Sequence, residues 1–326
     1  MTKQKLICIK CGRTNPKKSL NCISCKGFYS LLTVEYSSNK LLNIKELYNN
    51  YLPYHLFKDN DFKNCSLTKF NKNIWLKNEG ENESKSIKEK DIFVGLKVAS
   101  YLGYKKTLCV SGGSGKNVVN FFQKQANFPL IKLYSPKGED YEKTFKLALY
   151  NKNKNVWNIT PGINPYSQEG SKTIAWQIID SKIDFETILI PCGNGSSLWG
   201  IYKGFLEAKE QGFVKKVPKI FGVELKNGPI GKSLRSGKME KNGKILNSKA
   251  HSIDVKESFS LQKAVMVIKL TAGGIINVSE KEINKAYKVL HKKKYLSNFT
   301  AAAALAGANK LKRFNKICCI LTADEF

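Results

Sequence analysis

The sequence predicts an α/β fold with mostly parallel sheets, preceded by a small N-terminal zinc ribbon. Two observations carry the main prediction. Short apolar strands alternate with helices along most of the 326 residues, and glycine-rich turns join some strands to the helices that follow them. A third observation, two Cys-x-x-Cys pairs near the N-terminus, predicts the ribbon.

The predicted strands and helices follow one another regularly from residue 73 onward. A helix begins at Ile87, because Ile92, Leu96 and Ala99 fall on one face, and Gly103 is placed to end it. The other expected helices are 117–126, 141–149, 172–180, 198–211, 280–292 and 301–311. The expected strands are 73–77, 107–110, 130–134, 156–159, 187–190, 219–225 and 317–321.

The composition is that of a folded protein outside the membrane. Hydrophobic residues make up 42% and charged residues 25% of the chain, which is typical of a globular domain. No apolar run is long enough to span a bilayer, and the first residues lack the apolar core of a signal peptide. We therefore expect a cytoplasmic protein with no membrane partner.

The formal charge of +29 has two explanations. Dense lysine and arginine release counterions from nucleic-acid backbones, or the composition has drifted toward lysine as a whole. The lysines are spread along nearly the whole chain, and the only arginines are Arg13, Arg235 and Arg313. Base-specific contacts favour arginine, so drift is favoured over a nucleic-acid partner. A positive field would also attract an anionic small-molecule substrate.

The first candidate site is a metal site formed by Cys8, Cys11, Cys22 and Cys25. Two Cys-x-x-Cys knuckles can deliver four thiolates to one tetrahedral zinc ion. All four positions are filled by cysteine, so no coordination position is open and the zinc would serve folding rather than catalysis. Chance cysteines or a redox pair are the alternatives.

The second candidate site is the loop formed by Gly193, Asn194, Gly195, Ser196 and Ser197, between a predicted strand and a predicted helix. Glycines let the backbone approach an anion, and the N–H groups at the start of the helix point at it. The two serines add hydroxyl donors. The loop predicts a phosphate site, and a simple tight turn is the alternative.

The third candidate is Lys88, in the first turn of the helix that begins at Ile87. In a chain with 55 basic residues, such a lysine is ordinarily a solvated surface charge. Lys85 and Lys90 lie close by in the sequence, and like charges lower the pKa of an amine, which favours its nucleophilic form.

Three stretches resemble a known family. They read NPYSQEGSKTIA at 164–175, IPCGNG at 190–195 and IYKGF at 201–205. Together they resemble threonine synthase, a member of the tryptophan synthase β-like (fold type II) pyridoxal-phosphate enzymes. The resemblance covers most of the chain and implies two three-layer αβα domains, at 37–160 and 161–326, after a zinc ribbon at 1–36. It also implies pyridoxal 5'-phosphate as cofactor and a homodimer.

The resemblance assigns roles to individual residues. Lys88 matches the lysine that forms a Schiff base with the cofactor, and 193–197 matches the cradle of the cofactor's phosphate. Thr322 matches the residue that hydrogen-bonds the pyridine nitrogen, and a neutral partner there suits elimination and replacement over transamination. The residues that match the loop holding the substrate carboxylate are Ser111, Gly112, Gly113 and Gly115.

The sequence also departs from the family's pattern. The family's NPTGSFKDR is NESKSIKEK at 82–90, which keeps the asparagine, a serine and the lysine. Ser114 takes the place of the asparagine that contacts the cofactor's ring hydroxyl. Ser167 stands where threonine synthases usually carry an arginine that grips the substrate phosphate, and Pro161 and Gly162 replace nearby polar residues of that clamp. An arginine pairs bidentately with phosphate, so its loss is not neutral.

Three functions are therefore open. The first is a pyridoxal-phosphate-dependent, threonine synthase-like lyase of amino-acid biosynthesis, which converts O-phosphohomoserine to threonine by elimination and replacement at the β/γ carbon. The second keeps the cofactor and changes the amino-acid substrate, as in a cysteate synthase-like β-replacement or a dehydratase (ammonia-lyase). The third is a degenerate, non-catalytic scaffold that binds nucleic acid. The whole-chain resemblance favours the first.

Overall fold

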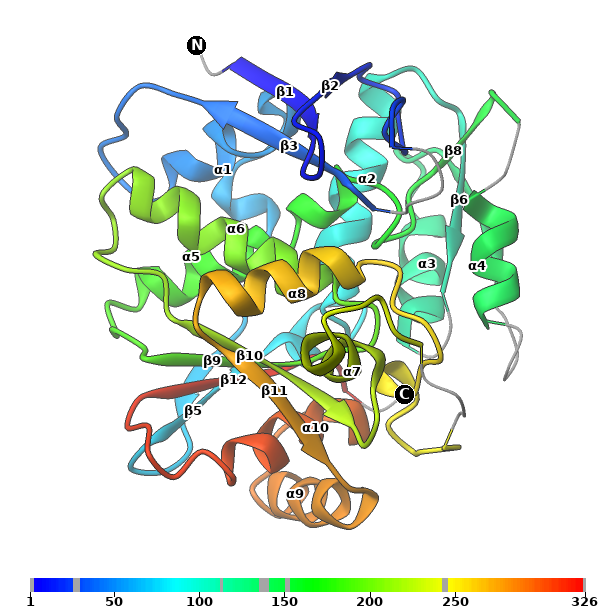
Figure 1. Ribbon diagram of the computed structural model, residues 1–326. Coiled ribbons are helices and arrows are strands. Elements are labelled where there is room, and N and C mark those ends of the chain that lie inside the picture. The colour runs from blue at the N-terminus through cyan, green and yellow to red at the C-terminus, as the bar shows by residue number, and fades with distance from the viewer. Residues whose placement is uncertain are drawn as a thin grey trace.

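A computed structural model describes residues 3–25, 30–111, 114–134, 141–149, 153–241 and 246–324. In this part of the chain the fold is mixed α/β, with one six-stranded and two three-stranded sheets. The six-stranded sheet has the order β11-β10-β9-β12-β5-β4 (Figure 1). Its strands are β4 (Leu67–Lys69), β5 (Ile74–Asn78), β9 (Thr187–Pro191), β10 (Lys219–Leu225), β11 (Gly274–Val278) and β12 (Ile317–Leu321).

The large sheet is parallel except for its edge strand β4, which runs antiparallel to β5. Every residue of β9 and of β12 is buried. Parallel strands covered on both faces are expected to be continuously apolar, and the sequences TILIP and ICCIL have this character. The covering helices α5 (Lys172–Asp180), α6 (Ser196–Glu210) and α8 (Leu261–Leu270) lie above the sheet in Figure 1, and α9 (Glu280–Lys292) and α10 (Phe299–Ala308) lie below it.

A smaller parallel sheet has the order β7-β6-β8. Its strands are β6 (Lys106–Val110), β7 (Leu130–Tyr134) and β8 (Val156–Asn158). The helices α2 (Lys88–Tyr101), α3 (Ser114–Gln123) and α4 (Tyr141–Leu149) accompany it in Figure 1. Phe93 on α2 stacks on Phe122 on α3, with ring centroids 6.1 Å apart.

The third sheet, β2-β1-β3, is antiparallel and belongs to the N-terminal module, which we define as residues 3–25 and 30–37. Its strands are β1 (Lys3–Cys8), β2 (Thr14–Asn15) and β3 (Leu32–Ser37), and α1 (Glu46–Asn50) follows. Helix α6 holds β3 by two side-chain hydrogen bonds. Lys203 Nζ donates to the Val34 carbonyl at 2.6 Å, and Trp199 Nε1 donates to Thr33 Oγ1 at 3.3 Å.

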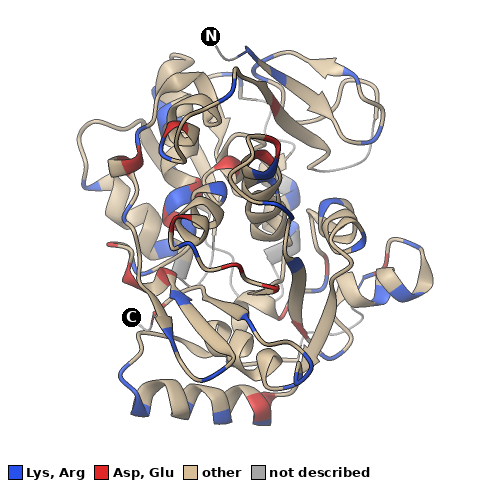
Figure 2. Cartoon of the chain, turned by 90° about the vertical axis from the view of Figure 1, so that its left-hand side faces the viewer, with Lys and Arg blue, Asp and Glu red and all other residues tan. Residues whose placement is uncertain are grey.

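Most of the strands and helices predicted from the sequence are confirmed. The sequence prediction omitted β4, β11, α8 and α7 (Pro229–Ser236). The predicted division at residues 36 and 160 stays a prediction. Strands β4 and β5 share the large sheet with strands that follow residue 160. Within the described ranges, no helix combines the length and apolar character needed to cross a bilayer. Figure 2 shows lysine and arginine on many elements in that view, interspersed with aspartate and glutamate.

Candidate active site

The candidate site lies where three parallel strands of the large sheet end. The carboxyl ends of neighbouring parallel strands meet at one edge, where open α/β sheets bind their ligands. Strand β5 leads to Lys88, β12 leads to Thr322, and β9 leads to the 193–197 loop. Because β12 lies between β9 and β5, the sheet order brings these three predicted groups to the same edge.

The segment before Lys88 is fixed to the end of β12. The backbone N–H of Ile87 donates to the Thr322 carbonyl at 2.8 Å, and Ser86 forms an antiparallel bridge with Ala323. These contacts hold the first turn of α2 beside Thr322. The backbone segments that carry Lys88 and Thr322 are therefore adjacent.

Lys88 differs from the other lysines whose pKa is lowered by burial. Burial lowers the pKa of four described lysines: Lys77, Lys88, Lys172 and Lys263. Three of the amines are bonded to backbone carbonyls, carboxylates or an amide oxygen. The amine of Lys88 has no hydrogen-bond or ion-pair partner among the described residues. An amine with a lowered pKa and no partner is a candidate nucleophile.

Ser111 and Gly115 lie against Lys88. A Cβ at Gly115 would overlap Ser111 Oγ and lie 3.2 Å from Lys88 Cδ, so only glycine fits between them. Gly112 and Gly113 lie outside the described residues, as does the side chain of Ser114. The described part of the predicted substrate loop is therefore in contact with the predicted catalytic lysine.

Two buried hydroxyls beside Lys88 lack partners. Thr322 Oγ1 and Ser84 Oγ have no hydrogen-bond partner within the described chain, and the two residues are 8% and 4% exposed. A buried polar group left unpaired costs free energy, so such groups are uncommon unless a ligand satisfies them. Both hydroxyls are available to a bound molecule.

The 193–197 loop is a tight strand-to-helix turn. Gly195 has a φ of +81°, and a Cβ there would lie 2.8 Å from Ala264 Cβ. The first helical bond of α6 runs from Trp199 N to the Gly195 carbonyl at 3.4 Å. The N–H groups of Ser196 and Ser197 therefore have no carbonyl behind them in the helix. Together with the dipole of this 15-residue helix, they suit an anion.

Asn194 is held from the opposite side by residues 258–260. Its side-chain Oδ1 accepts from Phe259 N at 2.7 Å, and its carbonyl accepts from Ser258 Oγ at 2.8 Å and Ser260 N at 3.1 Å. The amide oxygen of Asn194 therefore fixes the loop. Asn194 was predicted to bind the cofactor, and this stays a prediction.

Ser167 supplies no cation at the family's arginine position. It is fully buried, its Oγ donates to the Ile159 carbonyl at 2.9 Å, and a Cβ at Gly95 would overlap that Oγ. A small residue at 167 therefore packs against a glycine of α2.

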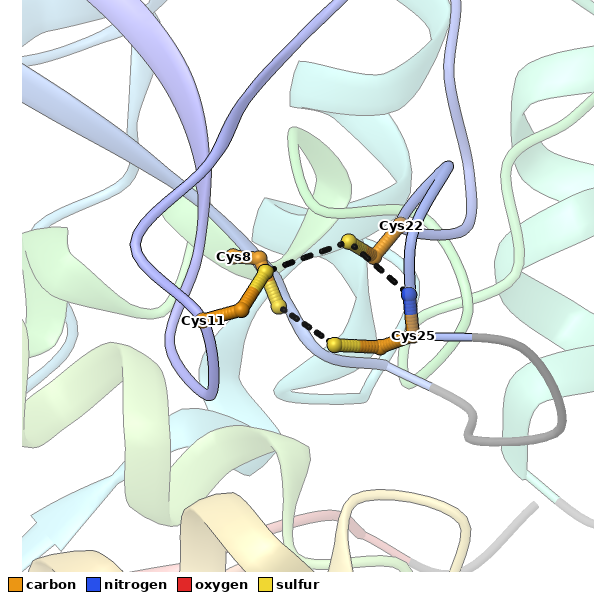
Figure 3. Close-up of side chains that lie close together, drawn as sticks. All are labelled: Cys8, Cys11, Cys22 and Cys25. Atoms are coloured by element: carbon orange, nitrogen blue, oxygen red, sulfur yellow. Dashed lines mark hydrogen bonds between the residues drawn. The ribbon is translucent and has the colours of Figure 1, made fainter.

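The four predicted metal-binding cysteines form one cluster (Figure 3). Their sulfur atoms all lie within 4.8 Å of one another, which suits a single metal ion. Cys8 Sγ is 3.9 Å from Cys25 Sγ, and Cys11 Sγ is 3.7 Å from Cys22 Sγ. Burial opposes ionisation of Cys22, but the backbone N–H groups of Cys25 and Ser24 lower the pKa of the Cys22 thiol to about 6.

Two features of the site were not predicted. Asp91, three residues after Lys88 on α2, is buried and accepts from Ser171 Oγ at 2.7 Å. Its spacing from Lys88 could have identified it, because residues i and i+3 share a helix face. The 258–260 segment that holds Asn194 carries no sequence motif, so nothing in the sequence alone indicated it.

Comparison with known proteins identifies the family. Residues 114–323 match the family model described as pyridoxal-phosphate dependent enzyme. The chain belongs to this family. The predicted family resemblance and the prediction of an enzyme are confirmed.

Individual relatives of this pyridoxal-phosphate-dependent enzyme are more distant. It is 28% identical over 270 residues to threonine synthase of Methanosarcina acetivorans, covering 74% of this chain and 65% of that protein. The chain thus spans less than two thirds of that relative's length. Among solved structures, Escherichia coli threonine synthase has a TM-score of 0.64 at 15% identity, covering 81% of this chain and 69% of that one. The T.th. threonine deaminase has a TM-score of 0.63 at 18% identity, covering 78% and 86%. At these identities the likeness to solved structures shows the fold.

Proposed function

We propose that this enzyme is a threonine synthase-like lyase that converts O-phosphohomoserine and water to threonine and phosphate. The observation that carries the proposal is the unpartnered amine of the half-buried Lys88, in the turn that is bonded to the end of β12, where Thr322 has an unpartnered hydroxyl. A catalytic lysine must be neutral to act as a nucleophile or a base, and burial favours the neutral form.

The residues present fit pyridoxal phosphate. Lys88 offers a free amine for the aldehyde, Thr322 a free neutral hydroxyl for the ring nitrogen, and 193–197 a turn whose N–H groups suit the phosphate. By the family resemblance, Ser114 would also help to hold the cofactor. When bound, the cofactor supplies an electron sink for the carbanion formed at the substrate's α-carbon.

The chain's own side chains would position the substrate and move protons. Ser111 and the backbone around Gly112, Gly113 and Gly115 would bind the substrate carboxylate next to Lys88. The neutral Lys88 amine would take a proton from a substrate carbon and return it to another. Burial lowers the pKa of Lys88, and this effect outweighs the opposing effects of Cys109 and Asp91.

We further propose structural zinc at Cys8, Cys11, Cys22 and Cys25. The convergence of four sulfur atoms supports it, since four thiolates suit a closed tetrahedral zinc site. Metal analysis of protein purified under reducing conditions tests the assignment. About one zinc per chain, lost in a Cys11→Ser/Cys22→Ser variant, is the expected result, and protein free of zinc would refute it.

Ser167 favours a second candidate function, lyase chemistry on an amino acid without a phosphate group. The buried Ser167 side chain is bonded to a backbone carbonyl and offers no charge to a substrate phosphate. A dehydratase that acts on serine or threonine needs no such clamp. The described residues offer no specific support for the third function, a nucleic-acid-binding scaffold.

One substrate screen separates the two candidates. Purified enzyme with added pyridoxal phosphate is incubated with O-phosphohomoserine, threonine or serine, and phosphate, ammonia and oxo-acid release are measured. The proposed function predicts phosphate and threonine from O-phosphohomoserine only, at a rate that Lys88→Ala abolishes. Oxo-acid and ammonia from serine or threonine, without phosphate release from O-phosphohomoserine, would establish the second function instead.

A further inference from the structure

A chain of buried polar contacts links the N-terminal module to the 193–197 loop. It begins at Ser260, whose backbone N–H bonds to the Asn194 carbonyl and whose hydroxyl is 3.2 Å from Ser30 Oγ. Ser30 is 2% exposed, has a φ of +56° and precedes β3. The residue that holds the loop is therefore itself in contact with the N-terminal module.

The contacts continue from Ser30 through a glutamine and a buried lysine. Gln168 Nε2 donates to Ser30 Oγ at 2.8 Å, and Gln168 Oε1 accepts from Lys263 Nζ at 2.5 Å. Lys263 Nζ also donates to the Leu32 carbonyl at 2.6 Å. All of these side chains are buried, and a buried donor or acceptor that loses its partner is costly.

The last member of the chain adjoins the cysteine cluster. Leu32, the first residue of β3, is the register partner of Cys8, the last residue of β1. Cys8 is one of the four clustered cysteines. The cysteine cluster is thus connected to Asn194 through a series of residues, each in contact with the next. In order, these are Cys8, Leu32, Lys263, Gln168, Ser30 and Ser260.

We propose that the N-terminal module is a positioning element for the cofactor's phosphate loop, so that metal binding at the four cysteines and pyridoxal-phosphate binding at 193–197 strengthen each other. Ser30 and Ser260 are positioning residues, since they act on the loop through Asn194. The inference rests on the proposed function, because it takes 193–197 as the phosphate site. Two sites coupled by one ordered network must affect each other's affinity by the same factor.

The test measures the dissociation constant of pyridoxal phosphate by titrating cofactor-free full-length protein and following its absorbance. Ser30→Ala, Ser260→Ala and wild type stripped of metal under reducing conditions are each expected to bind about three- to tenfold more weakly. Bound cofactor should slow metal loss to a chelator in wild type and do so less in the two serine variants.

The matched control is Thr271→Ala, at the other end of α8 from Ser260. Thr271 is 8% exposed and its Oγ1 donates to the Val267 carbonyl at 2.9 Å, so the variant also loses a buried hydroxyl bond. It should bind pyridoxal phosphate as wild type does.

Each outcome decides. Unchanged affinity in both serine variants and in metal-free protein overturns the inference and leaves the proposed function standing, as does an equal loss in Thr271→Ala. Wild type that binds no pyridoxal phosphate defeats the proposed function itself, and the inference with it. Weaker binding by the serine variants and by metal-free protein, with Thr271→Ala unchanged, supports the inference, even if the purified protein proves to hold another metal. Weaker binding by the serine variants alone overturns the coupling to the metal.

Discussion

The backbone N–H of Ile87 donates a 2.8 Å hydrogen bond to the carbonyl of Thr322. Ile87 immediately precedes Lys88, whose amine has no partner among the described residues, and Thr322 carries the unpartnered hydroxyl. The bond thus brings together two residues, Lys88 and Thr322, that are 234 positions apart in the chain. Strands β5 and β12 are adjacent and parallel, so the two groups come from neighbouring strand ends. The proposed active site is built on this junction.

Thr322→Val removes the unpartnered hydroxyl and keeps the shape of the side chain. The free energy of unfolding of the cofactor-free protein should change by less than about 1 kcal/mol, because no described residue bonds to Oγ1. Affinity for pyridoxal phosphate, measured by absorbance titration, should fall about tenfold. Thr322→Ser is the control that retains the hydroxyl, and equal affinity in Val and Ser variants would remove Thr322 from the site.

Lys85→Gly should stabilise the protein. Lys85 has a φ of +61°, a left-handed conformation that costs a residue with a side chain about 1 kcal/mol relative to glycine. The family carries glycine at this place. Chemical denaturation should give a gain of about 0.5–1 kcal/mol. Gly103→Ala, at φ +85° with nothing within 4 Å of the new Cβ, should give a loss of similar size. A lower free energy of unfolding in Lys85→Gly would contradict the claim that the backbone at Lys85 is strained.

Glu79→Gln should destabilise the protein in a pH-dependent way. Burial opposes ionisation, but Lys90 at 2.6 Å and Lys77 at 3.3 Å lower the pKa of Glu79 from 4.5 to about 2. A depressed pKa adds stability above pH 4.5 that is lost as the pH falls toward 2, about 3 kcal/mol in all.

Urea midpoints at pH 7 and pH 3 test this sign. The variant should be less stable than wild type at pH 7, because it leaves two buried ammonium groups without a carboxylate. The difference should narrow at pH 3. The exposed Glu83→Gln is the control, and a difference independent of pH would refute the assignment.

Asp91→Asn should change the free energy of unfolding in the opposite direction to Glu79→Gln, and should stabilise the protein. Burial raises the pKa of Asp91 from 3.8 to about 7, against the lowering effect of its bonds from Ser171. Between these two pH values the Asp91 carboxyl is protonated in the folded state and ionised in the unfolded state. The contribution of Asp91 to the free energy of unfolding is therefore complete below pH 3.8 and is lost as the pH rises to 7. The asparagine keeps an acceptor for Ser171 Oγ. It should therefore raise stability at pH 8, by up to about 4 kcal/mol, and by less at pH 5. Thermal unfolding of the variant, beside the exposed Asp180→Asn, checks this, and reduced stability at pH 8 would contradict it.

The alternation of strands and helices was predictable because apolar periodicity reports burial directly. Helix α8 was not predicted because Lys263 lies on its buried face. A lysine in the sequence normally indicates an exposed position. Strand β11 begins with a glycine, Gly274, which weakens the strand signal.

The candidate site was predictable only in part. Lys88 and Thr322 were indicated by resemblance, and their freedom from partners needed the structure. The bond between Phe259 and Asn194 joins residues 65 positions apart, and no local pattern encodes such a contact. The same holds for Ser30 and Ser260, which are 230 positions apart.

The visible absorption spectrum of purified full-length protein with added pyridoxal phosphate tests the central claim most directly. Wild type, Lys88→Ala and Lys97→Ala are compared after removal of unbound cofactor. Lys97 lies on the same helix and is partly exposed, so it controls for loss of a lysine from α2. The account predicts a visible band of lysine-bound cofactor in wild type and Lys97→Ala, and none in Lys88→Ala. A band that persists unchanged in Lys88→Ala, or no cofactor bound by wild type, would contradict it.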